Sequence, residues 1–150
     1  MTLAKAIGGG FPMGAFVVTE RLAHVFKPGD HGSTFGGNAL SCASCYAAIK
    51  AMKELELDKK ARKTGEYFKK GLEALKAKHP DKVTDVRGLG LILGMELAKP
   101  GASLVTKALD KGLIINCTAG NVLRFVPPLV IGEAEIDTLL KGLDELLAEF

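Results

Sequence analysis

Cysteine is scarce in this sequence, and long apolar runs are absent. The three cysteines, Cys42, Cys45 and Cys117, are an odd number in a chain that carries no export signal. A disulfide framework is therefore not expected, and the sequence predicts free thiols. No uninterrupted apolar run is long enough to cross a bilayer, and the N-terminus lacks the basic-then-apolar pattern of a secretory signal. By default, these absences predict a cytoplasmic protein without a membrane span.

Neither sign of charge is in excess. The 20 basic and 17 acidic residues leave a net charge of +3, which is too balanced to indicate a nucleic-acid partner. Hydrophobic residues make up 47% of the chain and the mean hydropathy is +0.19, which is apolar for a soluble domain of this size. We therefore expect part of the surface to face further chain or a partner.

The residues around Lys5 are unusual for a lysine. Lys5 follows a short apolar run and precedes three consecutive glycines at 8–10, and the next charged side chain is Glu20. A desolvated ammonium loses its proton more readily, and a neutral amine is what carbonyl addition needs. The pattern favours a Schiff-base lysine. The alternative, on spacing alone about as strong, is a lysine near the start of the chain that frays into water.

A second segment of small residues lies at 31–38. A loop of this kind can bring backbone amides and hydroxyls against an anion. Without further information, a glycine-rich turn that binds nothing is the better interpretation. The small or hydroxyl-bearing residues are Gly32, Ser33, Thr34, Gly36 and Gly37.

Four segments carry a resemblance to a known family. They are residues 2–15, which contain the sequence Lys5-Ala6-Ile7-Gly8-Gly9-Gly10-Phe11-Pro12, and residues 31–40, 85–91 and 123–129. In this order, and over the whole chain, they resemble the class III pyridoxal-phosphate-dependent aminotransferases, most closely the branch of acetylornithine and ornithine aminotransferases. The chain corresponds to less than half of such an enzyme and looks like its C-terminal portion.

The resemblance implies a role for each candidate site residue. Lys5 is the lysine that binds pyridoxal 5'-phosphate and transfers the proton. Thr34, together with Ser33, contacts the cofactor phosphate, and the family's threonine does so across a dimer interface, which implies a homodimer. Arg124 is the clamp for the substrate carboxylate, since a guanidinium binds a carboxylate with two parallel hydrogen bonds. Arg87 is expected to have a structural role at the domain junction.

The implied activity is transfer of an amino group between N-acetylornithine, or a similar diamine derivative, and 2-oxoglutarate in arginine biosynthesis. Ornithine, succinylornithine and 4-aminobutyrate aminotransferases are close alternatives. A further alternative, of a different class, is a non-catalytic dimerisation module. In the family, the carboxylate for the pyridine nitrogen, the stacking aromatic and the main phosphate loop all precede the lysine. We therefore expect this chain alone to bind the cofactor weakly or not at all.

The expected fold class is α/β followed by α+β. Residues 1–53 correspond to the tail of a fold-type I large domain, with a buried strand at 14–19 and a buried helix from Ala39 to about Leu55, capped by Asn38. Residues 58–150 are expected to form a small α+β domain with an antiparallel sheet. Its helices are predicted at 58–79, 101–111 and 133–150. Residues 83–97 are predicted to form a long strand or a hairpin, and two further strands are predicted at 113–117 and 122–126.

Cys42 and Cys45 form a C-x-x-C pair in the predicted helix at 39–55. Zinc or redox chemistry would be possible, but no second pair exists and only Cys117 and three histidines remain as ligands. Small buried cysteines are the better interpretation. We therefore predict no metal site.

Overall fold

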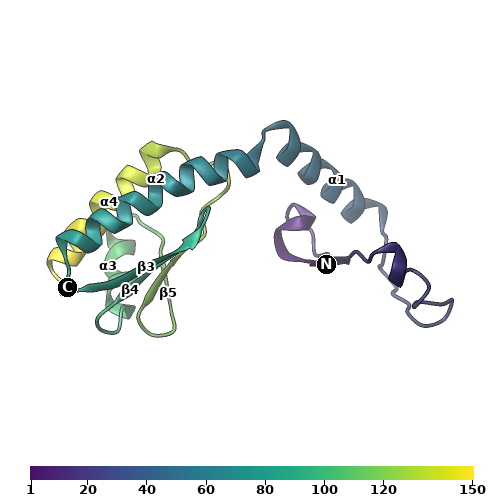
Figure 1. Ribbon diagram of the computed structural model, residues 1–150, viewed down its shortest axis with the longest axis horizontal. Coiled ribbons are helices and arrows are strands. Elements are labelled where there is room, and N and C mark those ends of the chain that lie inside the picture. The colour runs from purple at the N-terminus through teal and green to yellow at the C-terminus, as the bar shows by residue number, and fades with distance from the viewer. The chain divides into compact units, whose positions relative to one another are not determined.

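The computed structural model describes residues 1–150 and divides into two units, Met1–Glu56 and Leu57–Phe150 (Figure 1). The second unit holds almost all of the buried apolar side chains. The first unit carries the candidate lysine and the segment of small residues. No helix combines the length and apolar character that a membrane span requires.

A four-stranded antiparallel sheet forms the second unit's framework. Its order is β3-β4-β6-β5, so the long hairpin of the first two strands occupies one side and the shorter hairpin the other. Alternate residues of the central strand, Leu93, Met95 and Leu97, are buried on one face, as the twofold alternation of a half-covered strand requires. The strands are β3 (Val83–Leu89), β4 (Ile92–Leu97), β5 (Asn116–Thr118) and β6 (Val122–Phe125).

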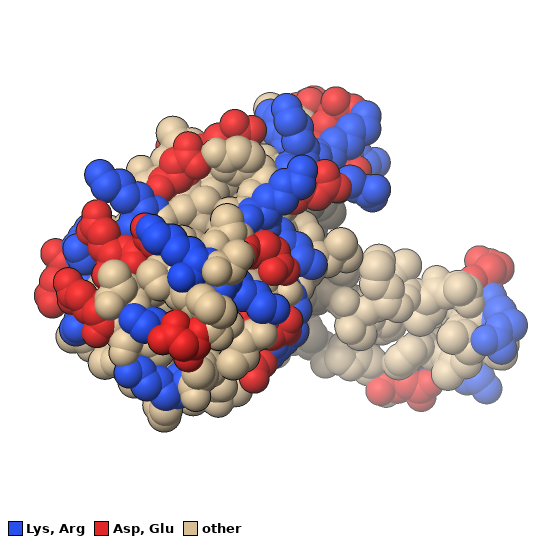
Figure 2. Space-filling model, turned by 60° about the vertical axis from the view of Figure 1, so that its left-hand side comes forward, with Lys and Arg blue, Asp and Glu red and all other residues tan.

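Three helices cover the buried face of this sheet: α2 (Leu57–Lys78), α3 (Ala102–Asp110) and α4 (Glu133–Ala148), with α2 and α4 side by side (Figure 1). Helix α2 buries Phe68, Leu72 and Leu75, which recur at helical spacing in the sequence. Its lysines lie mostly on the exposed side. Figure 2 shows that basic and acidic side chains are interspersed over the face of this unit that it displays.

The glycines at the β3–β4 turn permit a close backbone approach. Gly65, inside α2, lies directly against Gly90 at the turn: a Cβ built on Gly65 would be 2.7 Å from the Gly90 Cα and closer still to its carbonyl group. Gly90 itself has φ 57°, which only glycine adopts readily. These glycines therefore mark a close approach of two backbones.

The ends of α2 and α4 are joined by an ionic cluster. Lys78 Nζ donates to Asp144 Oδ2 at 2.6 Å, and His79 Nε2 lies 2.8 Å from Asp144 Oδ1. Lys78, and then His79, hold the pKa of Asp144 below its ordinary value. Nearby, Lys82 Nζ donates to the Leu147 carbonyl at 2.6 Å and so satisfies an acceptor that the helix end leaves free.

The first unit consists of a short strand pair and one long helix. Strand β1 (Thr2–Leu3) pairs antiparallel with β2 (Ala15–Phe16), and α1 spans Ala39–Glu54. Asn38 caps α1, since its side chain accepts a hydrogen bond from the Ser41 backbone amide at 2.9 Å. The predicted helix and its cap are therefore confirmed.

Burial in the first unit differs from the prediction. The strand expected at 14–19 is only the two residues of β2, and Phe16, Val17 and Val18 are exposed. Helix α1 exposes most of its length; its covered side runs through Ser41, Ser44, Cys45 and Ala48. A segment can be buried only where other residues pack on it, and residues 1–56 offer these faces little.

A smaller difference occurs in the second unit. Strand β5 begins at Asn116, so Leu113–Ile115 precede it. Helices α2 and α4 and the hairpin of β3 and β4 agree with the prediction.

Candidate functional site

Lys5 lies where β1 gives way to a tight turn. Ala4 is still extended, whereas Lys5 has φ 62° and begins a single 3-10 turn, Lys5–Gly8. A left-handed backbone costs a non-glycine residue about 1–2 kcal/mol. Such strain is found preferentially at functional sites, where the surrounding structure enforces it.

The turn is enforced by its packing on α1. The Gly8 carbonyl accepts a hydrogen bond from Ser44 Oγ at 2.8 Å, and Gly8 is buried. A Cβ on Gly9 would lie 2.9 Å from the same hydroxyl oxygen, and Gly9 also has a positive φ of 58°. The glycines after Lys5 are therefore needed for close contact with the helix, which fixes the backbone that carries the lysine.

The surroundings of the Lys5 side chain correct the sequence prediction. The side chain is exposed and forms no ion pair or hydrogen bond. The apolar setting expected from the neighbouring residues is absent because the glycine segment packs on α1 and not on the lysine. The amine is thus free of competing partners, and residues 1–56 do not desolvate it.

The loop that contains Ser33 lies close to the lysine segment. Residues 12–14, the loop residues Ser33 and 35–37, and the start of α1 line a cavity of about 240 Å³. This cavity lies at the N-terminal end of α1, where the helix dipole favours an anion. Ser33 is in its lining, whereas Thr34 is exposed and outside it. The structure thus brings Ser33, but not Thr34, to this cavity.

The lining of the cavity limits what these residues can hold. The lining of this cavity offers a hydroxyl and backbone amides for a phosphate group but no carboxylate for a pyridine nitrogen. Ser33 and the adjacent backbone therefore fit the phosphate end of pyridoxal 5'-phosphate, while Lys5 lies outside the lining of this cavity. Contacts to the ring must come from other residues.

Arg124 lies on the face of the second unit's sheet that no helix covers. In the register it stands opposite Gly94 of β4 and Asn116 of β5, and Gly94 in turn stands opposite Arg87 of β3. Directly opposed residues of antiparallel strands point to the same face. The order across the open face is therefore Arg87, Gly94, Arg124, Asn116, a set we call the arginine row.

The two arginines of this row differ in their partners. Arg87 Nη1 donates to Asp85 Oδ2 at 2.9 Å and to Glu96 Oε2 at 2.6 Å. These carboxylates raise the pKa of Arg87, and Arg87 holds the pKa of Asp85 below its usual range. Arg124 is exposed and has no such partner. Arg87 is therefore a structural ion-pair residue, and only Arg124 has a guanidinium available for a ligand carboxylate.

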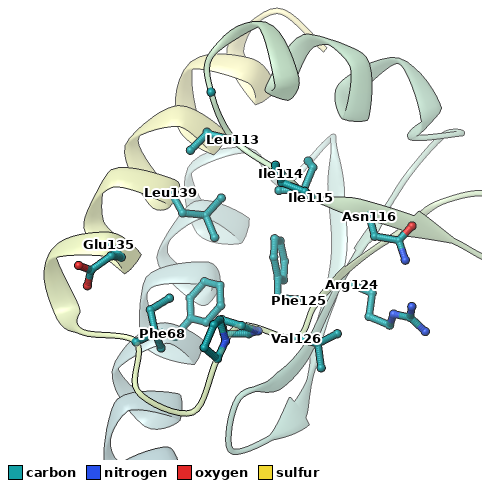
Figure 3. Close-up of a pocket in the computed structure, with 14 residues that line it drawn as sticks. Phe68, Leu113, Ile114, Ile115, Asn116, Arg124, Phe125, Val126, Glu135 and Leu139 are labelled. Atoms are coloured by element: carbon teal, nitrogen blue, oxygen red, sulfur yellow. The ribbon is translucent and has the colours of Figure 1, made fainter. Parts of the chain in front are cut away.

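Arg124 also borders a larger hollow. A cavity of about 430 Å³ is lined mainly by apolar residues, among them Phe68, Phe125 and Leu139, with Arg124 and Asn116 at its edge. Figure 3 shows Arg124 and Asn116 together on the side of the strands away from Phe125 and Phe68. An apolar hollow with polar groups on one side is the usual composition of a small-molecule site.

Asn116 is the residue that the sequence reasoning missed. Its side chain is exposed and forms no hydrogen bond. Asparagine is depleted in strands, so an asparagine between the inward-facing Ile115 and Cys117 was a detectable signal. It could not be assigned before the register placed it opposite Arg124.

The cysteines also differ from the prediction in part. Cys42 is exposed and Cys45 and Cys117 are partly exposed, so the expectation of buried thiols is wrong for Cys42. Cys42 is exposed in the lining of the cavity at the start of α1. All three are free thiols, as predicted. The chain brings no three His, Cys, Asp or Glu side chains together as metal ligands.

Comparison with known proteins places these features in context. The family model described as aminotransferase class-III matches residues 1–147. The chain is 48% identical to the acetylornithine aminotransferase of Methanocaldococcus jannaschii over 149 residues, covering 99% of this chain and 37% of that protein. It is 52% identical to the acetylornithine aminotransferase of Caldanaerobacter subterraneus over 150 residues, covering 99% of this chain and 38% of that protein.

A solved structure shows the same fold. The acetylornithine aminotransferase of Elizabethkingia anophelis superposes with a TM-score of 0.92 at 35% identity, covering 99% of this chain and 38% of the other. The predicted fold class, the end of a fold-type I large domain followed by a small α+β domain with an antiparallel sheet, is confirmed. The chain spans less than two fifths of the length of these relatives.

Proposed function

Because the chain belongs to the class III aminotransferase family, we propose that the protein is a pyridoxal-phosphate-dependent aminotransferase. Its reaction moves an amino group between N-acetylornithine, or a similar diamine derivative, and 2-oxoglutarate in arginine biosynthesis. The observation that carries this proposal is identity of 48% and 52% to two acetylornithine aminotransferases over 99% of the chain. We further propose that residues 1–53 are the tail of the cofactor-binding domain and that residues 58–150 are the small C-terminal domain.

The free amine of Lys5 is the proposed catalytic group. Bound pyridoxal 5'-phosphate supplies the electron sink that stabilises negative charge on the substrate carbon. Lys5 would hold the cofactor through its amine and, once that amine is free, would accept the proton from the substrate Cα. Two observations support this role of Lys5: its strained backbone at φ 62° and its side chain, which has no ion-pair partner.

Ser33 and Thr34 are the proposed phosphate contacts. Ser33 lines the cavity at the start of α1, where a phosphate group fits. Thr34 is exposed beside it and is available to a second copy of the chain. We therefore propose a cytoplasmic homodimer in which Thr34 of each subunit contacts the cofactor phosphate of the other.

Arg124 is the proposed substrate clamp. Its guanidinium is free of the carboxylates that neutralise Arg87, and it lies exposed on the uncovered face of the sheet. The planar fork then holds the α-carboxylate of N-acetylornithine, glutamate or 2-oxoglutarate with two parallel hydrogen bonds.

The decisive assay measures glutamate formed by the full-length protein from N-acetylornithine and 2-oxoglutarate in the presence of cofactor. Lys5→Ala should lower kcat by at least about 10²–10⁴-fold, since the group that transfers the proton is lost. Lys27→Ala is the matched control, because Lys27 is an exposed lysine of the same unit. Equal activity in Lys5→Ala and the control would contradict the role of Lys5.

The same assay with other donors separates the alternatives. A higher kcat/KM for ornithine, succinylornithine or 4-aminobutyrate would assign the protein to one of those activities. No transamination of any donor by the full-length protein would favour a non-catalytic dimerisation module.

The isolated chain of 150 residues gives a separate test of the cofactor site. Because its cavity has no carboxylate for the pyridine nitrogen in its lining, we expect weak or undetectable binding of pyridoxal 5'-phosphate. Titration is followed by the near-visible absorbance of lysine-bound cofactor. A tight signal that disappears in Lys5→Ala would show that residues 1–150 suffice for the site.

A further inference from the structure

The geometry points to Asn116 as a second carboxylate-binding residue that acts together with Arg124 and recognises the α-carboxylate of the substrate. This inference rests on the proposed function and assigns a residue to the same site. It would make the clamp a three-donor site: two N–H groups from the guanidinium and one from the Asn116 carboxamide.

Position is the first argument. Asn116 of β5 and Arg124 of β6 are a directly opposed pair in the antiparallel register. The Cβ atoms of such pairs are about 4.5–5.5 Å apart on the same face of the sheet. Figure 3 shows both side chains on that face, at the edge of the 430 Å³ cavity that both line. A carboxylate held by the Arg124 fork is therefore within reach of the Asn116 amide.

The second argument is that the side chains of Asn116 and Arg124 have unused hydrogen-bond donors. Neither side chain makes a hydrogen bond or ion pair with the rest of the chain, although Arg87 in the same row has two carboxylate partners. Gly94 stands on the other side of Arg124 and has no side chain to offer. Asn116 is therefore the one member of the arginine row beside Arg124 that can add a donor to a ligand.

The chemistry is the third argument. A carboxylate has about four lone-pair positions, and an arginine fork uses two of them. A carboxamide N–H can donate to a third without adding charge, so the guanidinium stays unneutralised. An acidic residue at 116 would instead pair with Arg124 and repel the ligand. An asparagine on an exposed strand position is otherwise unfavourable.

The direct test is side-chain NMR of the 150-residue chain. N-acetylornithine is titrated while the Asn116 carboxamide and Arg124 Nε–H resonances are followed, and the α-amide of N-acetylornithine serves as the uncharged control ligand. We expect both resonances to shift when N-acetylornithine is added and neither to shift when its α-amide is added. Asn116→Ala should weaken the affinity read at Arg124 about five- to tenfold, as expected for one hydrogen bond to a charged group at an exposed site.

Two further variants separate ligand binding from a structural role. Asn116→Asp should weaken binding more than Asn116→Ala, because the new carboxylate pairs with Arg124 and repels the ligand. Thr118→Ala, two residues along on the same face of β5, is the matched control and should leave the affinity unchanged. Equal losses in the Asp and Ala variants, accompanied by equal falls in the unfolding midpoint, would overturn the inference.

The outcomes also distinguish this inference from the proposed function. Movement of the Arg124 resonance without movement at Asn116 would refute the role of Asn116 and leave the Arg124 clamp intact. If neither moves, both residues lose the assigned role in this chain. The transamination assay of the full-length protein then decides the proposed function independently. In that assay, Asn116→Ala should raise the KM for both N-acetylornithine and 2-oxoglutarate five- to tenfold with little change in kcat.

Discussion

The contact between Gly65 and Gly90 gives a prediction whose sign opposes that of helix propensity. Gly65 is inside α2, where replacing glycine by alanine normally stabilises a helix by about 0.8–1 kcal/mol. In this structure, however, the added Cβ would lie 2.7 Å from the Gly90 Cα and closer to the Gly90 carbonyl group. Backbone atoms cannot rotate out of the way, so α2 and the hairpin must move apart.

The net effect follows from the two opposing terms. Inserting a methyl into a well-packed contact costs about 1–3 kcal/mol, with the upper end applying when the opposing atoms are backbone. Subtracting the gain in helix propensity leaves Gly65→Ala less stable by about 2 kcal/mol. With a urea m-value of about 2 kcal/mol per M, the unfolding midpoint should fall by about 1 M without a change in m.

Gly71→Ala is the matched control for Gly65→Ala. It lies in the same helix, but its Cβ would meet the methyl groups of Leu140, one of them at 3.0 Å and the other closer, and a half-buried leucine tip can change rotamer. We expect a much smaller loss, since the propensity gain offsets most of the repacking cost. The assay is urea unfolding followed by far-ultraviolet circular dichroism. Gly65→Ala as stable as the wild type, or a loss as large in Gly71→Ala, would refute the reasoning.

Two other side chains make testable contributions to stability. In the folded protein, Lys78 and, to a smaller extent, His79 hold the pKa of Asp144 below its ordinary value of 3.8. The Asp144 carboxylate therefore stabilises the fold at pH values above its unfolded-state pKa, and this stabilisation is lost as the pH falls through its folded-state pKa. Asp144→Asn should therefore lower the urea midpoint at neutral pH and flatten its fall below pH 3.8; an unchanged acid slope would argue against the ion cluster. Asn38→Ala should cost α1 about 1 kcal/mol by removing the acceptor for the Ser41 amide. Amide hydrogen exchange in the first turn of α1 should then speed up in Asn38→Ala but not in Asn38→Asp, which keeps an acceptor; equal exchange in the two variants would contradict the cap.

The helices of the second unit could be predicted because their apolar residues recur at helical spacing and so indicate which side is buried. In α2, Phe68, Leu72 and Leu75 alternate with lysines at helical spacing, so both the extent and the face of the helix follow from the residues. The sequence of helix α1 has no such apolar pattern. Alanine, serine and cysteine occur on all of its sides, so its extent and its Asn38 cap were predictable and its covered side was not.

For the candidate site, too, some features could be predicted from the sequence and others could not. Lys5, Ser33 and Arg124 could be named from sequence because their segments resemble those of a family. Their local settings could not, because the exposure of Lys5 and the availability of Arg124 depend on contacts between residues distant in the chain. Asn116 shows the limit most clearly, since only the pairing of β5 with β6 places it beside Arg124.

The contact of Gly65 with Gly90 also ties helix α2 to the strand that lies beside Arg124. Gly90 begins the turn into β4, and Gly94 lies four residues, or roughly 13 Å of strand, further along and opposite Arg124. Any sliding of α2 along its own axis must carry the hairpin tip with it, because the two backbones touch without intervening side chains. A displacement of helix α2 is therefore expected to move the hairpin tip and, with it, the strand beside Arg124, the proposed carboxylate-binding residue.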